Sequence, residues 1–283
     1  MKGPDLPPIY ADFCDKVLAT HMDISLPISD KDKEVLEDKI YDFYLQKELG
    51  THDIDNTIDA WIEYWEKLYP KGRLGLPNGS WLPYNKTKTP LESVLGEINE
   101  FKKMNPGVND CEKLDKDIKE KANQFVFFEL DKLEINYRVY VNLKPDKVHD
   151  IAEMLIEFGP PMVVNSFKFA GPGVFGTQAD SLVVYCNSEK DAKEIANKIN
   201  TSAGEKGVKE FRPATTEQVG SPGIGIAPEP IGTESYGRTI CDSISEGIIY
   251  YQKNKEEVDG SQVSPEGLIK KFVSIWLKDE GLF

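Results

Sequence analysis

The sequence predicts an α+β fold in two parts: a helical N-terminal module over residues 1–120, and a mixed, mainly antiparallel sheet with packed helices over residues 121–283. Two observations predict this fold class. Apolar residues recur at helical spacing in the first third of the chain, and beyond residue 120 they alternate as in strands, with amphipathic helices in between. We expect the domain boundary near residue 120, inside a polar, charged segment.

The N-terminal module is expected to contain three helices. Apolar residues at helical spacing predict helices over residues 32–46 and 54–68, and Pro90 is expected to open a third that runs to about residue 103. Residues 71–90 are rich in glycine, proline and asparagine, and therefore predict a long exposed loop.

The C-terminal part begins with two predicted strands, over residues 124–130 and 135–143, whose short connecting turn indicates a β-hairpin. After a helix over residues 145–156, strands over residues 162–169 and 181–186 are joined by a glycine-rich connection. The remaining predicted elements are a helix capped by Ser188, a short strand over 208–212, an irregular segment over 213–230, and helices over 234–252 and 265–278. The last helix is expected to bury Leu268, Phe272, Ile275 and Trp276.

The composition argues against several classes of function. A net charge of -14 and a pI near 4.8 disfavour general nucleic-acid binding, which needs a basic surface. The chain has no apolar run of membrane-spanning length and no secretory signal, so we expect a cytoplasmic protein without a membrane partner. Four cysteines without CxxC spacing are expected to be buried thiols, and three histidines without paired spacing predict no metal site.

A lysine in a predicted strand is the first candidate for chemistry. Lys168 alternates with Phe167 and Phe169, so its side chain is expected on the opposite face of the strand. One interpretation is an exposed lysine on an edge strand, which discourages aggregation. The other is a general base, because a lysine among other cations loses proton affinity, and its neutral amine can take a weakly acidic proton.

Two arginines are candidates for holding an anion. Arg138 and Tyr140 are expected on the same face of one strand, which places a cation beside a phenol. Arg238 is expected in the first turn of a helix, where free N–H groups and the positive end of the helix dipole favour a phosphate. A surface arginine held in an ion pair is the alternative for Arg238.

Separated segments of the chain, in this order, resemble the HopA-type family. They are residues 137–143, Lys168, residues 180–185, residues 222–227 and residues 235–238. This family includes a type III effector and the lyases of class V lanthipeptide and thioamitide biosynthesis, and it is more distantly similar to the phosphothreonine lyase effectors. The resemblance covers the C-terminal part well and the helical module only loosely.

The resemblance implies a phosphoserine or phosphothreonine lyase, which eliminates phosphate to give dehydroalanine or dehydrobutyrine. By this analogy Lys168 takes the α-proton. Arg138 and Arg238 hold the phosphate, with Lys144 and Arg212 as possible helpers.

Two positions depart from the pattern of the relatives. Tyr140 stands where the distant effector lyases carry a general-acid histidine, and a phenol can donate a proton with a different pH dependence. Gln178 stands where an arginine is expected, which leaves an inactive relative open as an interpretation. Tyr185 is expected to orient the site or to hydrogen-bond the base.

The implied reaction needs no metal or organic cofactor. Its implied partners are a kinase that installs the phosphate and a precursor peptide, which the helical module and the loop over residues 71–88 could bind. The aromatic candidates for a peptide groove are Trp61, Trp65, Trp81 and Tyr84, although a helical stripe that contains Trp61 and Trp65 is more typical of a core.

Two other functions remain open at this point. One is a non-catalytic module that captures a phosphopeptide or acts as a scaffold. The other is a type III effector lyase, secreted into a host cell, that acts on host phosphoproteins.

Overall fold

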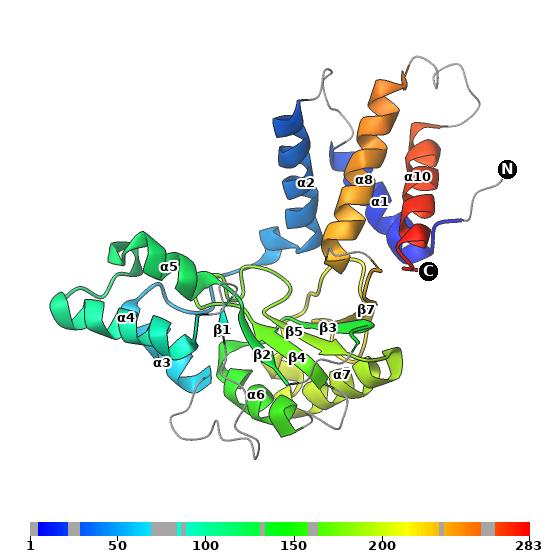
Figure 1. The fold of residues 1–283 in the computed structure, drawn as a ribbon. Coiled ribbons are helices and arrows are strands. Elements are labelled where there is room, and N and C mark those ends of the chain that lie inside the picture. The colour runs from blue at the N-terminus through cyan, green and yellow to red at the C-terminus, as the bar shows by residue number, and fades with distance from the viewer. Residues whose placement is uncertain are drawn as a thin grey trace. The chain divides into compact units, whose positions relative to one another are not determined.

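The computed structural model is an α+β structure, as predicted, with helices and one seven-stranded sheet (Figure 1). It describes residues 5–21, 29–68, 84–85, 89–130, 134–157, 164–231, 235–255 and 264–283. The chain forms two compact units. One, the helical unit, comprises Met1–Glu48, Pro213–Thr216 and Ala227–Phe283; the other, the sheet unit, comprises Leu49–Arg212 and Glu217–Ile226.

This division differs from the boundary expected near residue 120. Helix α2 (Asp30–Tyr44) packs on α8 (Tyr236–Lys253), so the start and the end of the chain share one unit. Helices α3 (Ile58–Leu68), α4 (Leu91–Met104) and α5 (Lys116–Asn123) instead belong to the sheet unit. Local sequence patterns could not show this grouping, because it depends on contacts between residues about 200 positions apart, such as the one that joins Arg238 to Asp38.

In the helical unit, α8 packs between α2 and α10 (Pro265–Asp279), and α1 (Pro8–His21) contacts α2 and α10. Serine side chains cap three of these helices: the hydroxyls of Ser29, Ser235 and Ser264 each accept a hydrogen bond from a backbone N–H three residues ahead. These caps satisfy donors that the first helical turn leaves unpaired.

The predicted buried stripe of α10 is wrong by one residue. The buried side chains are Ile269, Val273, Ser274 and Leu277, whereas Ile275 is 47% exposed. Phe272 is only partly buried and stacks on Tyr250 of α8, with 5.6 Å between the ring centroids. The contact with α8 therefore uses the helix face next to the predicted one, and the large aromatic side chains cover its margin.

The sheet has the strand order β1-β2-β4-β5-β3-β7-β6. The strands are β1 (Tyr84–Asn85), β2 (Val126–Glu129), β3 (Tyr137–Val141), β4 (Val164–Phe169), β5 (Leu182–Cys186), β6 (Glu217–Gln218) and β7 (Ile224–Pro228). The pairs β1–β2, β2–β4, β4–β5, β3–β5 and β6–β7 are antiparallel.

The hairpin predicted for residues 124–143 is wrong, because β2 and β3 are not neighbours. The antiparallel pair β4–β5 lies between them, so the consecutive strands β2 and β3 flank a pair that follows later in the chain. Two further predictions are corrected nearby. The segment 208–212 contributes only a single bridge from Val208 to Leu143, and the segment expected to be irregular contains β6 and β7.

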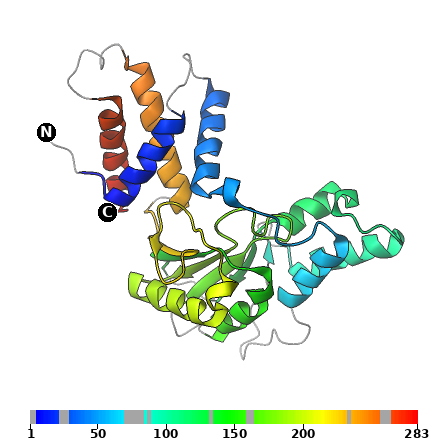
Figure 2. The same ribbon diagram turned by 180° about the vertical axis from the view of Figure 1, so that it is seen from behind.

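The register gives the sheet two different faces. On one face, apolar side chains of β2, β4 and β5 are fully or almost fully buried in the core, among them Val126, Phe128, Phe167, Phe169 and Val184. Helix α7 (Glu189–Ala203) contacts β3 and β5, and it packs against α6 (Val148–Glu157) (Figure 2). The other face carries the polar and charged side chains described below.

The glycine-rich connection between β4 and β5 is packed against the sheet unit. The Tyr64 hydroxyl donates a hydrogen bond to the Ala170 carbonyl (2.6 Å), and the Gly173 N–H donates one to Asn123 Oδ1 (3.0 Å). Gly176 has a φ of 81°, and its carbonyl accepts from the Thr51 N–H at 3.0 Å. These bonds tie the connection to Tyr64 of α3, to Asn123 of α5 and to the backbone of Thr51.

The four cysteines are buried free thiols, as predicted. Burial raises the pKa of the Cys14 and Cys186 thiols to about 12, so both stay protonated at neutral pH. In the part of the chain that the structure describes, no helix has the length and apolar character needed to cross a membrane.

Candidate functional site

Lys168 lies on an internal strand of the sheet. Strand β4 is flanked by β2 and β5, so the interpretation of Lys168 as an edge-strand lysine is wrong. Its side chain is partly buried and points to the face opposite Phe167 and Phe169, as the alternation predicted. A partly buried lysine inside a sheet loses hydration that it keeps at an edge, and therefore calls for a specific role.

Two rows of side chains cross this face. The first row is Phe127, Lys168, Val183 and Tyr140, and the second is Glu129, Ser166, Tyr185 and Arg138. We call the face that carries these two rows the cationic face. Because paired residues of antiparallel strands share a face, β2, β4, β5 and β3 each contribute two side chains to it.

Two aromatic rings lie close to the Lys168 ammonium. Its Nζ lies 4.3 Å from the centroid of the Phe125 ring and 5.5 Å from that of Phe127. Within the part of the chain that the structure describes, no hydrogen bond and no carboxylate engages this ammonium. Sequence reasoning missed both phenylalanines. The sequence feature that could have revealed them is strand β2, which carries aromatic residues on both of its faces.

Arg138 and Tyr185 are in direct contact. They pair across β3 and β5, and the guanidinium carbon of Arg138 lies 5.0 Å from the centroid of the Tyr185 ring. Both are 8% exposed. Stacking on a tyrosine fixes the plane of the guanidinium, so its N–H groups keep a defined direction for a bidentate contact with phosphate.

Tyr140 is in the same row as Lys168, with Val183 between them. Two strand spacings separate their Cα atoms by about 10 Å. Tyr140 is 4% exposed, and the expected sharing of one face by Arg138 and Tyr140 is confirmed. The structure thus brings four of the predicted site residues to one face: Arg138, Tyr140, Lys168 and Tyr185.

The other predicted cations of the sheet unit lie at the end of β3 and near β6–β7. Lys144 precedes the short helix η3 (Pro145–Lys147), and its backbone N–H donates to the Gly207 carbonyl at 2.9 Å. Arg212 donates through Nη1 to Gln218 Oε1 at 3.1 Å and to the Pro222 carbonyl at 3.2 Å. Burial lowers the pKa of the Arg212 guanidinium, which still remains protonated at neutral pH.

Arg238 belongs to the helical unit, where it is held by acidic residues. As predicted, it lies in the first turn of its helix, and its backbone N–H donates to the capping Ser235 Oγ at 3.4 Å. Its guanidinium pairs with Asp38 at 3.3 Å and with Asp242 at 3.7 Å. Within this unit Arg238 therefore has the geometry of the second interpretation, a surface arginine held in ion pairs.

Gln178 takes part in the glycine-rich connection. Its side-chain amide donates a hydrogen bond to Asp180 Oδ1 at 2.6 Å, and Asp180 is 6% exposed. At the position where relatives are expected to carry an arginine, this chain therefore has a neutral group bonded to a carboxylate.

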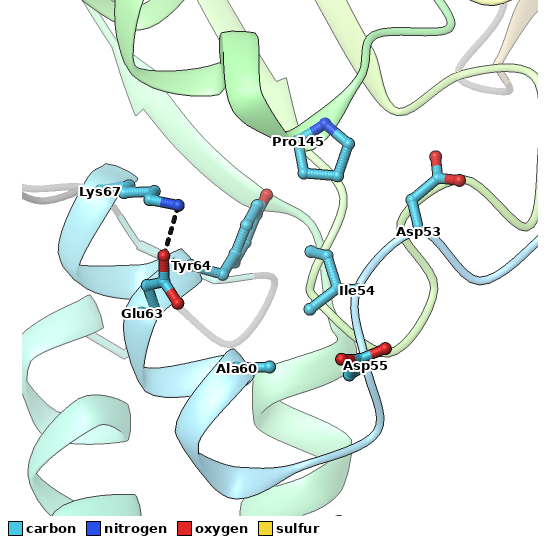
Figure 3. A pocket seen from close by; sticks show the side chains of 8 residues that line it. All are labelled: Asp53, Ile54, Asp55, Ala60, Glu63, Tyr64, Lys67 and Pro145. Atoms are coloured by element: carbon cyan, nitrogen blue, oxygen red, sulfur yellow. Dashed lines mark ion pairs between the residues drawn. The ribbon is translucent and has the colours of Figure 1, made fainter.

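A cleft of about 200 Å³ lies elsewhere in the sheet unit (Figure 3). It is lined by Asp53, Ile54, Asp55, Ala60, Glu63, Tyr64, Lys67 and Pro145. Lys67 pairs with Glu63 at 2.6 Å, as the dashed line in Figure 3 marks. Among the lining residues, three carboxylates outnumber the single lysine, which disfavours a phosphate. The cleft contains none of the predicted site residues.

Trp61 and Trp65 are core residues, at 1% and 0% exposure. The core interpretation of this helical stripe is confirmed. The predicted loop over residues 71–88, which includes Trp81, lies outside the described residues, except for the backbone of Tyr84 and Asn85.

An α+β protein that presents cations and phenols on one face of its sheet is the class that these observations define. The chain belongs to the HopA1 effector protein family, whose model matches residues 116–272 and so includes the whole cationic face. This finding confirms the resemblance to the HopA-type family.

Two solved structures are similar to this chain. One is the effector protein from Pseudomonas syringae pv. tomato strain DC3000, with a TM-score of 0.56 and 15% identity over 92% of this chain and 95% of that one. The other is the effector protein from Pseudomonas syringae pv. syringae strain 61, with a TM-score of 0.49 and 17% identity over the same shares. The similarity to the first of these structures supports the α+β fold described above. No curated protein matches the chain.

Proposed function

We propose that this protein is a phosphoserine/phosphothreonine lyase, a carbon–oxygen lyase that eliminates phosphate from a phosphorylated peptide. One observation carries the proposal. Lys168 is partly buried on an internal strand, has no hydrogen bond or ion pair in the described part of the chain, and shares a face with Arg138, Tyr140 and Tyr185. A lysine whose nitrogen no carboxylate occupies can reach a substrate, and the neutral form of a lysine can act as a base.

The proposed step balances with these side chains alone. The neutral amine of Lys168 takes the α-proton, the electrons of the C–H bond form the Cα=Cβ double bond, and the bond from Cβ to the phosphate oxygen breaks. Tyr140 gives its phenolic proton to the departing oxygen. The products are a dehydroamino acid and hydrogen phosphate, and a proton that returns from Lys168 to Tyr140 through water restores both groups.

Arg138 is the proposed primary phosphate ligand, oriented by its contact with the Tyr185 ring. Lys144 and Arg212 are proposed as helpers. Arg238 is not included in this site, because its guanidinium pairs with Asp38 and Asp242 within the helical unit. The reaction itself requires no organic cofactor or metal ion.

The proposed substrate is a precursor peptide that a partner kinase has phosphorylated, as in lanthipeptide or thioamitide biosynthesis. The helical N-terminal segment is proposed to bind this peptide. The effector descriptions of the family and of the first similar structure make a phosphoprotein of a host cell the alternative substrate for the same chemistry. Elimination rates on both substrates, compared at equal concentration, distinguish these two sources.

The decisive experiment is mass spectrometry of a phosphoserine or phosphothreonine peptide after incubation with the protein. Loss of phosphoric acid with formation of a thiol-reactive alkene is the expected result. Loss of the phosphoryl group alone would mean hydrolysis and would contradict the proposal.

A lysine substitution separates catalysis from binding. Lys168→Ala should lower the elimination rate at least 100-fold, as is typical for loss of a general base, while peptide binding stays measurable. Lys190→Ala, at an exposed position of α7, is the matched control and should leave the rate unchanged.

A non-catalytic phosphopeptide-binding module is the second candidate. The pairing of Gln178 with Asp180 favours it, because a neutral side chain stands where an arginine is expected in relatives. A wild-type protein that binds the phosphopeptide but leaves it unchanged would establish this function and exclude the lyase.

A further inference from the structure

Two phenylalanines form an aromatic seat for the proposed base. Phe127 is paired with Lys168 across β2 and β4, and Phe125 lies two residues earlier, just before β2. Both ring centroids are within the roughly 6 Å over which an aromatic face attracts a cation. Both side chains are only partly buried, and Phe125 also packs against the core.

Few charged groups compete with these rings for Lys168. The charged and titratable residues of the neighbouring strands on this face are Glu129 of β2, Arg138 and Tyr140 of β3, and Tyr185 of β5. Glu129 is exposed, pairs with Ser166 and makes no ion pair with Lys168. In the described part of the chain, the two rings are therefore the groups that contact the Lys168 ammonium.

We propose that Phe125 and Phe127 are positioning residues that direct Lys168 Nζ and stabilise the positive charge it gains during elimination. This inference rests on the lyase function proposed above. Before the reaction the amine that acts as base is neutral, and an aromatic face attracts it only weakly. As the α-proton arrives, Nζ becomes positive and the negative faces of both rings attract it.

The interaction is therefore stronger in the transition state than in the complex whose Lys168 is neutral, so the rings contribute to the rate constant of proton transfer from that complex. The rings exchange no proton or electron with the substrate. They act only through Lys168, so their loss should slow the chemical step without changing the affinity for the phosphate group.

Leucine and tyrosine substitutions at both positions test this role by steady-state kinetics. Phe125→Leu and Phe127→Leu should each lower kcat about three- to tenfold when it is compared on the high-pH plateau of its pH profile, with KM changed less than twofold. Phe125→Tyr and Phe127→Tyr keep an aromatic face and should keep at least half of the wild-type kcat. Phe272→Leu is the matched control, because Phe272 is also a partly buried aromatic residue but stacks on Tyr250, and it should leave kcat unchanged.

Nuclear magnetic resonance gives a readout that does not depend on turnover. Protons next to an aromatic face are shielded by its ring current, so the ε-methylene resonances of Lys168 should lie upfield and move downfield in Phe125→Leu. Unchanged resonances would show that the Phe125 ring does not lie against the Lys168 side chain. Wild-type kcat in both leucine variants would contradict the positioning role of the two rings. A wild-type protein with the upfield shift but without elimination would overturn the lyase function itself, and with it the catalytic role of the rings.

Discussion

The Ser181 hydroxyl hydrogen-bonds the end of β3 to the start of β5. The contacts of Ser181 determine how much the free energy of unfolding should fall when the hydroxyl is removed. Its hydroxyl accepts a hydrogen bond from the Leu143 N–H at 2.7 Å. The same oxygen lies 3.1 Å from the Val141 carbonyl and 3.2 Å from the Leu143 carbonyl, to one of which it donates. Ser181 and Leu143 are both 0% exposed, so water cannot replace these bonds.

Ser181→Ala keeps the backbone but leaves the Leu143 N–H buried without a partner. An unsatisfied buried donor costs about 1–3 kcal/mol, so we expect the free energy of unfolding to fall by about 2 kcal/mol. For a domain of this size, each kcal/mol lowers Tm by about 2–4 °C, which gives an expected decrease of about 4–8 °C.

Circular dichroism during heating and during urea unfolding measures both quantities. Ser93→Ala is the control, because Ser93 is exposed and its hydroxyl bonds only to Glu97, at 3.3 Å. This control should change the free energy by less than about 0.5 kcal/mol. An equally small change in Ser181→Ala would refute the reasoning, since it would mean that the Leu143 N–H finds another partner.

Three further predictions concern other parts of the sheet unit. Trp61→Ala should lower the free energy of unfolding by about 3–5 kcal/mol in urea titrations, because a fully buried ring leaves a large cavity; a loss below about 1 kcal/mol would contradict this packing. Gly176→Ala should destabilise the protein by more than about 1 kcal/mol in the same assay, because φ is 81° and a Cβ would meet the Asp53 carboxylate; wild-type stability would show that this turn can rearrange. Burial raises the pKa of Cys186 from 9.0 to about 12, so the thiol favours the folded state below pH 9 and this stabilisation is lost as the pH rises from 9 to 12. Between pH 8 and pH 10 this thiol should contribute a loss of about 1 kcal/mol, which Cys186→Ala should remove; equal losses in both proteins would refute the assignment.

The sequence was sufficient to predict the faces of individual strands. Alternation placed Lys168 opposite Phe167 and Phe169, and Arg138 on the same face as Tyr140, because the two-residue period of a strand is local information. The capping of a helix by Ser188 was also predicted correctly from four consecutive residues.

Strand order and side-chain partners were not predictable in the same way. The prediction of a β2–β3 hairpin was wrong because β4 and β5 lie between these strands in the sheet, and both come from a later part of the chain than the segment used for the prediction. The sequence left Lys168 open between an edge strand and a catalytic site, and the edge strand could be excluded only from the sheet order, which is not local information. The partners of Arg238 were also hidden, because Asp38 comes from a helix 200 residues away.

The strand order also bears on when the cationic face is assembled during folding. The β4–β5 pair is local in sequence, whereas β2 and β3 must each find their place beside it from earlier positions in the chain. Contacts between distant segments form slowly, because the loops between them must close first. Lys168 and Tyr185 come from the early pair, but Phe127, Arg138 and Tyr140 come from the strands that join it. We therefore expect that a newly made chain lacks the complete cationic face until its sheet is finished, so that a partly folded molecule presents only part of this face.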